Sequence, residues 1–128
     1  MKLSDYLENH RGVGILSTAN SAGEVNGAVY AKPHVIGRDE IAFIMRERLS
    51  RANLKQNVNA HYLFVEESGK SEGIRLQLDM IEENDDQELV GKLSRRPQRP
   101  GDGERRYLVT FKVRKAMALL GGSEVHLD

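Results

Sequence analysis

Three arginines and a serine stand together where a predicted strand passes into a predicted helix. The apolar run 41–45 indicates a buried strand, and it is followed directly by Arg46, Arg48, Ser50 and Arg51. At a helix N-terminus, free backbone N–H groups and the helix dipole both favour an anion. The arginine guanidinium adds paired donors that match phosphate oxygens. The segment therefore predicts a phosphate site, although a solvated turn with its arginines facing water fits the same spacing.

Other kinds of active site find little support. The chain has no cysteine, which excludes disulfides, thiolate metal sites and a cysteine nucleophile. It has neither a Gly-x-Ser-x-Gly elbow nor a Gly-x-Gly-x-x-Gly motif that opens a helix. The four histidines lack the paired spacing of metal ligands: they are His10, His34, His61 and His126. We therefore expect no metal site and assign no catalytic acid or base.

Length and composition predict a single domain over residues 1–128. The chain is 39% hydrophobic and 30% charged, which is typical of a globular protein, and its formal net charge is zero. A neutral chain has no overall attraction to nucleic acid or to a membrane surface. No apolar run is long enough to span a bilayer, and the first residues lack the apolar core of a secretory signal. We expect a cytoplasmic protein.

Charge is nevertheless distributed unevenly. Residues 66–88 hold nine acidic and two basic side chains, whereas residues 92–115 hold nine basic and two acidic ones. The basic part, from Arg95 to Arg106, is a candidate surface for nucleic acid or a protein partner. Only 5% of the residues are aromatic, which is little for stacking bases, so nucleic acid is the less favoured partner. We expect most of the 95–99 segment to be a solvated loop.

Alternation of apolar and polar residues predicts a mainly β (α+β) protein. Strands are expected at 13–19, 25–32, 40–46, 59–67, 73–81 and 105–115, with a short extension at 35–36 and a final short strand after 121–122. Short helices are expected at 5–11 with Ser4 as N-cap, at 50–56 with Ser50 as N-cap, and within 82–96. Six strands at hairpin-like spacing with short peripheral helices predict an antiparallel β-barrel.

Several segments together keep the order and residue types of one known family. They are 12–19, Gly23, 29–34, 41–46, 50–57, 60–64 and 75–76. In this order they resemble the pyridoxamine 5'-phosphate oxidase-like FMN-binding split-barrel family, especially its short bacterial members. The likeness is good over residues 12–81 and weak over 105–120. Its most specific part is the Asn53-Leu54 helix that follows the strand ending at Arg46.

The resemblance implies a six-stranded split barrel that forms a homodimer, with two FMN molecules between the subunits. It places the FMN phosphate at Arg46, Arg48 and Ser50, with Asn53 nearby; many relatives have a lysine where Ser50 stands. It places the flavin ring along the second and third long strands, at Ala28, Val29, Tyr30, Ala31, Ile44 and Met45. We also expect Arg75 or Arg105 to reach toward a flavin site, either the chain's own or that of the partner subunit, because a strand holds an arginine better than a loop does.

The implied function is that of an FMN-binding oxidoreductase, either flavin reductase-like or electron-transferring, with a small molecule or a protein as electron donor or acceptor. True pyridoxamine-phosphate oxidases end in a longer segment than residues 121–128 provide, so pyridoxine chemistry is not expected. Two alternatives remain open. One is a non-enzymatic barrel that binds nucleic acid or a protein partner through residues 95–106, and the other is a family member that binds haem or a deazaflavin.

Overall fold

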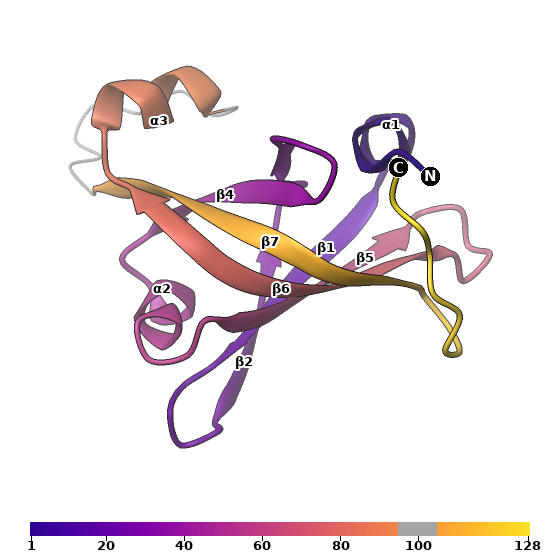
Figure 1. Ribbon diagram of the computed structural model, residues 1–128, viewed down its shortest axis with the longest axis horizontal. Helices are drawn as coiled ribbons and strands as arrows, with labels where there is room; N and C mark the ends of the chain where they lie inside the picture. Colours follow the sequence, from indigo (N-terminus) through magenta and orange to yellow (C-terminus); the bar gives the residue numbers. More distant parts are fainter. Residues whose placement is uncertain (95–104) are drawn as a thin grey trace.

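The structure, a computed structural model, describes residues 1–94 and 105–128. This part of the chain folds into one curled antiparallel sheet with the strand order β2-β1-β5-β6-β7-β4-β3, accompanied by short helices (Figure 1). The elements are α1 (Leu3–Asn9), β1 (Gly12–Ala19), β2 (Val25–Tyr30), β3 (His34–Val35), β4 (Glu40–Arg46), α2 (Leu49–Leu54), β5 (Asn59–Glu66), β6 (Gly73–Asn84), α3 (Gln87–Leu93) and β7 (Arg106–Ala118).

The predicted fold class is confirmed, but the number of strands was wrong. The sheet has seven strands rather than six, because His34 and Val35 pair with Ala42 and Ile41 and so form β3. Only a bridge between Met117 and Glu124 stands where a final strand was expected. β6 and β7 are longer than predicted and pair with two register shifts. Such bulges bend a strand pair, which helps to curl the sheet.

Helix boundaries also differ from the prediction. α1 begins at Leu3, with Lys2 rather than Ser4 at the N-cap position. α2 begins at Leu49, which places Ser50 inside the helix rather than at its cap. Asp86 caps α3 through its side chain, which accepts hydrogen bonds from the backbone N–H groups of residues 88 and 89. None of the helices in the described ranges is both long and apolar enough to cross a membrane.

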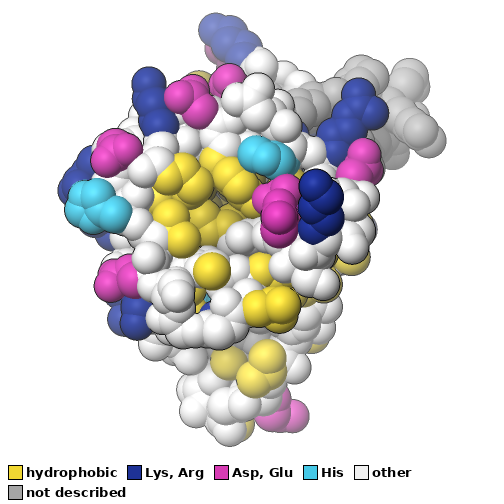
Figure 2. Space-filling model, turned by 90° about the vertical axis from the view of Figure 1, so that its right-hand side faces the viewer, with side chains coloured by type: hydrophobic (Ala, Val, Ile, Leu, Met, Phe, Trp, Pro, Cys, Tyr) yellow, Lys and Arg dark blue, Asp and Glu magenta, His cyan; other side chains and the backbone are white. Residues whose placement is uncertain are grey.

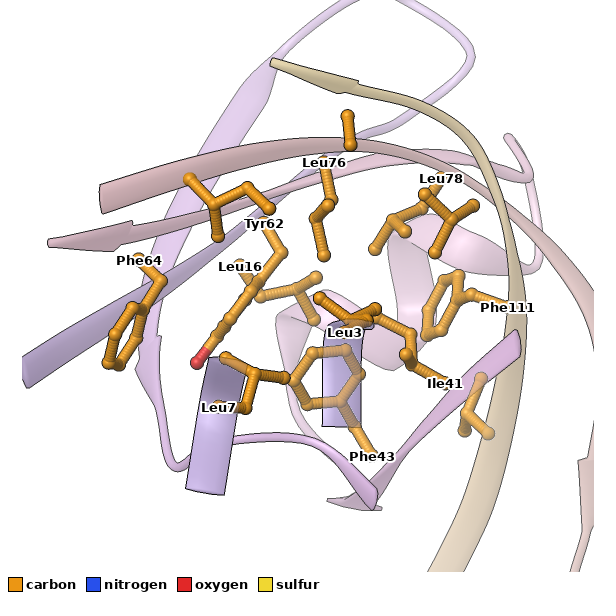
Figure 3. Packing of buried hydrophobic residues seen from close by; sticks show 14 of the residues in the cluster. Leu3, Leu7, Leu16, Ile41, Phe43, Tyr62, Phe64, Leu76, Leu78 and Phe111 are labelled. Carbon is orange, nitrogen blue, oxygen red and sulfur yellow. The ribbon is translucent and has the colours of Figure 1, made fainter. Parts of the chain in front are cut away.

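The core fills the inside of the curled sheet. Every second residue of β1, β5 and β6 points inward, as strand geometry requires, and α1 adds Leu3 and Leu7 from one end (Figure 3). Phe43 on β4 contacts Tyr30 on β2 with ring centroids 5.7 Å apart. The two ends of the strand order, β2 and β4 with β3, therefore approach each other. The split between them is where the candidate site lies.

α3 covers a second, smaller cluster on the other face of β4 and β7. Val90 of α3 packs there with Ala42 and Leu108, and Ile44 lies at its edge. Along β4, Met45 points into the main core while Ile44 and Arg46 point to the opposite face. This alternation decides which β4 side chains reach the site.

Candidate functional site

A groove runs along the split between β2 and the outer face of β4. One hollow of about 520 Å³ and a neighbouring hollow of about 260 Å³ share Val29, Tyr30, Ile44 and Arg46 in their linings, so they form one continuous groove. Eight of the predicted cofactor residues lie along it: Ala28, Val29, Tyr30, Ala31, Ile44, Arg46, Arg48 and Ser50. Residues far apart in the sequence are thus brought together as the resemblance implies.

The anion end of the groove is the turn between β4 and α2. The backbone N–H of Arg48 donates to the carbonyl of Arg46 at 2.8 Å, which makes the turn tight. Ser50 is buried at the first turn of α2 and also lines the groove. Burial raises the pKa of Tyr30, while the Ser50 side chain and the charge of Arg48 oppose that rise. The phenol of Tyr30 therefore stays protonated near neutral pH and can donate a hydrogen bond into the groove.

Two predicted residues turn away from the groove. The Met45 side chain is 1% exposed and belongs to the core. Asn53 is buried, and its Nδ2 donates to Oγ1 of Thr18 at 3.1 Å, which fastens α2 to β1. In this arrangement Asn53 positions the helix and does not face the groove. The role of Met45, which the resemblance limits largely to its backbone, stays a prediction.

Arg75 and Arg105 are also placed apart from the groove within one chain. The Arg75 Nε donates to the carbonyl of Ala118 at 2.9 Å, and its Nη2 donates to the carbonyl of Gly121. Arg75 therefore holds the start of the C-terminal segment. Arg105 is exposed and forms an ion pair with Asp85 at 3.0 Å. The basic residues Arg95 to Arg99 lie outside the described residues, so the predicted solvated loop stays a prediction.

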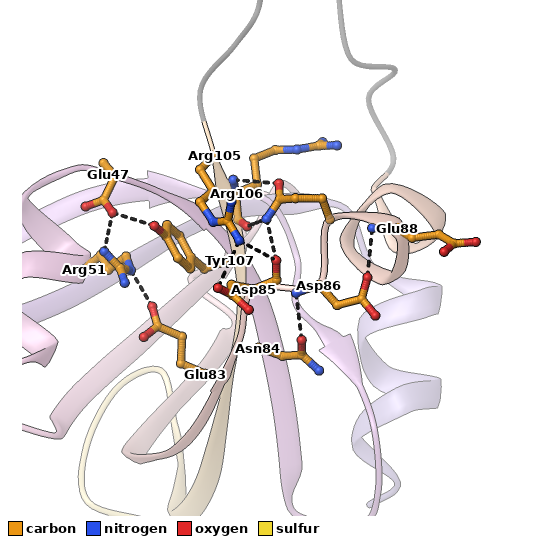
Figure 4. A network of polar contacts seen from close by, with 11 residues as sticks. Glu47, Arg51, Glu83, Asn84, Asp85, Asp86, Glu88, Arg105, Arg106 and Tyr107 are labelled. Carbon is orange, nitrogen blue, oxygen red and sulfur yellow. Dashed lines mark hydrogen bonds and ion pairs between the residues drawn. The ribbon is translucent and has the colours of Figure 1, made fainter.

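The third arginine of the phosphate segment has a structural role instead. The Arg51 guanidinium lies 3.5 Å from the centroid of the Tyr107 ring, donates to Glu47 Oε1 at 2.6 Å and also donates to Glu83. The hydroxyl of Tyr107 donates to the same oxygen of Glu47 at 2.7 Å (Figure 4). This anchor cluster ties the β4–α2 turn to β6 and β7. The sequence signalled only its Glu47–Arg51 pair, through its i,i+4 spacing.

Because Glu47 stands between Arg46 and Arg48, the anchor cluster fixes the turn that carries both arginines. The Tyr107 hydroxyl, followed by Arg51, holds the pKa of Glu47 below its ordinary value, and the bond to Glu47 in turn raises the pKa of Tyr107. Both shifts favour a glutamate that is charged and a tyrosine that is protonated. The cluster therefore persists near neutral pH and orients the two groove arginines.

We expect replacement of Glu47 by glutamine to destabilise the protein at pH 7 and to have a smaller effect in acid. The folded-state pKa of Glu47 lies below its unfolded value, so its stabilisation is present above about pH 4.5 and is lost as the pH falls through the folded-state pKa. Denaturant unfolding at both pH values measures this. The matched control is Glu88→Gln, because the Glu88 side chain is 82% exposed and, among the described residues, its ion pair is with the exposed Lys92. A Glu47→Gln deficit that is as large at pH 3 as at pH 7 would contradict this assignment.

The lining of the groove favours an anionic ligand. Its cationic lining comes from the segment after β2, from the end of β4 and the turn after it, and from the start of β7: Lys32, Arg46, Arg48 and Arg106. His34 of β3 lines the smaller hollow beside them. No Asp or Glu is among the described residues that line its two hollows. Apolar and aromatic side chains, including Val29, Tyr30 and Ile44, lie between the cations. This arrangement suits a planar ring system that carries a phosphate.

No protein-family model matches this sequence, and no curated protein sequence matches it either. Solved structures do match. HupZ of Group A Streptococcus superposes with a TM-score of 0.75 at 15% identity, over 95% of this chain and 94% of HupZ. An FMN-binding protein from Syntrophomonas wolfei gives 0.73 at 22% identity, over 90% of this chain and 82% of that one. A protein of the pyridoxinephosphate oxidase family from Clostridium acetobutylicum, related to general stress protein 26, superposes with a TM-score of 0.65 at 15% identity. The match covers 95% of this chain and 89% of that one.

These structures confirm the expected fold. The chain has the split-barrel fold of the pyridoxamine 5'-phosphate oxidase-like proteins along most of its length. Because the sequence identities are at most 22% among the three structures compared, the likeness establishes the fold and leaves the ligand to be argued from the groove itself.

Proposed function

We propose that this chain is an FMN-binding oxidoreductase of the flavin reductase-like or electron-transferring kind. The observation that carries the proposal is the groove itself, whose cationic turn at Arg48 and Ser50 leads into an apolar stretch at Val29, Tyr30 and Ile44. A phosphate fits the turn, and a planar flavin ring fits the strand edges. The FMN-binding protein of the same fold supports this choice of ligand.

Arg46, Arg48 and Ser50 would hold the phosphate, and β2 with Ile44 would hold the ring. Bound FMN would supply hydride or single-electron transfer. The chain's own residues bind and orient the cofactor and keep positive charge close to it. Positive charge near a flavin favours its anionic reduced form. An acid or base from the chain is not needed for this chemistry.

The outer face of the sheet supports a homodimer as part of the proposal. Outward positions on β1, β2 and β5 are apolar and exposed: Val13, Val25, Val29 and Val65. Val25 and Val29 are 75% and 76% exposed. Hydrophobic side chains also gather in the middle of the side that carries α1 and both termini (Figure 2). A second copy would cover such a surface, and Val29 would place the groove beside that interface.

We expect sedimentation to show a dimer at micromolar concentration, and we expect Val65→Lys to convert it to a monomer. A lysine at this position would have to be buried between the copies without a partner. Ile36→Lys serves as the control, because Ile36 is also an exposed apolar residue, at 54% against 36% for Val65, but follows β3 on another part of the molecule. A parent protein that sediments as a monomer while it holds FMN tightly would contradict the shared-interface proposal.

The visible spectrum of the freshly purified protein, followed by reconstitution with FMN, tests the proposed function. A flavin spectrum and tight rebinding of FMN are expected. A haem spectrum, a deazaflavin spectrum, or a colourless protein that takes up no flavin would each overturn the assignment of FMN. Binding of oligonucleotides by a colourless protein would support the binding-module alternative instead.

A further inference from the structure

Two arginines stand directly opposite each other in the sheet. Arg46 at the end of β4 and Arg106 at the start of β7 are partners in the antiparallel register. Directly opposed residues of neighbouring strands point to the same face, and like charges in that position destabilise a sheet. Both side chains line the smaller hollow of the groove. The pairing concentrates positive charge on one wall of that hollow.

Arg106 is buried although it carries a charge. It is 8% exposed, and within the described ranges its guanidinium makes one hydrogen bond, from Nη1 to Oγ of Ser94 at 2.8 Å. No carboxylate of the described residues contacts that guanidinium. A buried charge without a counter-ion is costly, and the guanidinium has five N–H donors. Toward the residues that the structure describes, Arg106 therefore has donors to spare at the wall of the smaller hollow.

The position of Arg106 is fixed in advance. The side-chain amide of Gln87 donates to the backbone carbonyl of Arg106 at 2.7 Å and accepts from its backbone N–H at 3.2 Å. Ser94 at the end of α3 orients the guanidinium. A side chain held in this way loses little entropy when it binds a ligand. Such pre-organisation is typical of a binding site.

Further positive charge reaches the same hollow from the segment after β2. Lys32 supplies this charge and lines the hollow together with His34 of β3, and the Lys32 Nζ is held beside it by the carbonyls of Leu7 and His10 at 2.7 and 3.1 Å. Arg48 and Ser50 line only the larger hollow, whereas Arg106, Lys32 and His34 line only the smaller one of these two. The groove thus has two cationic ends, with Arg46 reaching both.

We propose that the Arg46–Arg106 pair, with Lys32 and His34 nearby, is a second anion site that receives the phosphate or carboxylate group of the small molecule that reacts with the flavin. The inference rests on the proposed function, because it assumes that FMN is bound in the groove. It adds that the substrate is an anionic small molecule. The cofactor phosphate occupies the Arg48–Ser50 end. The substrate anion occupies the Arg106 end, which places the rest of the substrate over Tyr30 and Ile44.

The test titrates FMN-loaded protein with inorganic phosphate, against sodium chloride at equal ionic strength. The readouts are the flavin difference spectrum and the melting temperature. Arg106→Gln removes the charge, and Arg105→Gln is its matched control, since Arg105 is the exposed neighbour paired with Asp85. Arg46→Gln is a second variant in case Arg106→Gln does not fold; it is titrated with FMN kept saturating, because Arg46 lines both hollows and is also proposed to hold the cofactor phosphate. Arg106→Lys keeps the charge and should keep part of the binding.

The parent and Arg105→Gln should show a saturable effect of phosphate beyond that of chloride. Arg106→Gln or Arg46→Gln should bind phosphate at least about tenfold more weakly, because a charge-assisted bond is lost. The site is overturned if phosphate acts no differently from chloride. It is also overturned if the effect survives Arg106→Gln, or if it occurs only in flavin-free protein and depends on Arg48.

The last of these outcomes would mean that inorganic phosphate occupies the position proposed for the cofactor phosphate. Failure of the proposed function is recognised separately, by a protein that takes up no FMN. In that event the flavin-free protein is titrated in the same way. An Arg106-dependent effect of phosphate would then retain the anion site without the flavin.

Discussion

Replacement of Arg48 by alanine is expected to weaken FMN binding by about 1.5–3 kcal/mol, which is roughly a tenfold to hundredfold loss of affinity. Arg48 lines the anion end of the groove beside Ser50, so its loss removes a charge-assisted bond to the phosphate. Riboflavin has no phosphate and should bind the variant about as well as the parent. Fluorescence titration with both flavins measures the difference directly.

Arg38→Ala is the control for this experiment. Arg38 has a side chain that is 62% exposed, lies in the turn between β3 and β4, and pairs with the neighbouring Asp39. It should bind both flavins like the parent. Equal weakening of FMN and riboflavin by Arg48→Ala would show that this side chain supports the groove without contacting the phosphate.

Replacement of Arg51 by methionine is expected to lower the free energy of unfolding by about 2–3 kcal/mol. Methionine keeps much of the packing volume but leaves Glu47 and Glu83 without their shared cation and removes the stacking on Tyr107. Denaturant unfolding at pH 7 gives the change. FMN affinity should fall as well, because the anchor cluster orients the β4–α2 turn.

Arg114→Met provides the comparison for Arg51. Arg114 also pairs with a carboxylate, Asp79, at 3.0 Å, but its side chain is 48% exposed. Exposed pairs contribute about 0–1 kcal/mol. If Arg51→Met costs no more than Arg114→Met, the anchor cluster does not stabilise the fold in the way the geometry indicates.

The strands could be predicted from the sequence because apolar and polar residues alternate along a half-buried strand. The alternation along Gly73 to Ile81 and Arg105 to Lys115 is enough to place β6 and β7. A two-residue strand such as β3 is too short to show a period, so it could not be counted in advance. The cap of α2 was mispredicted because serine is favoured at an N-cap, whereas here the tight turn after Arg46 starts the helix one residue earlier.

The sequence also predicted the groove residues on β2 and β4, through the resemblance. It could not assign Arg51, because the partners that draw this side chain away from the groove, Glu83 and Tyr107, come from strands far along the chain. The same holds for Arg106. Its position opposite Arg46 depends on the register between β4 and β7, and no local pattern in the sequence specifies that register.

A crystal structure of the protein with FMN tests the central claim most directly. The proposal predicts the phosphate within hydrogen-bond distance of Arg48 and Ser50, and the flavin ring along Tyr30 and Ile44. It also predicts that the Arg46–Arg106 end of the groove is left open to a second anion. FMN bound elsewhere, for example in the adjoining hollow lined by Leu7, Val35 and Leu93, would contradict it.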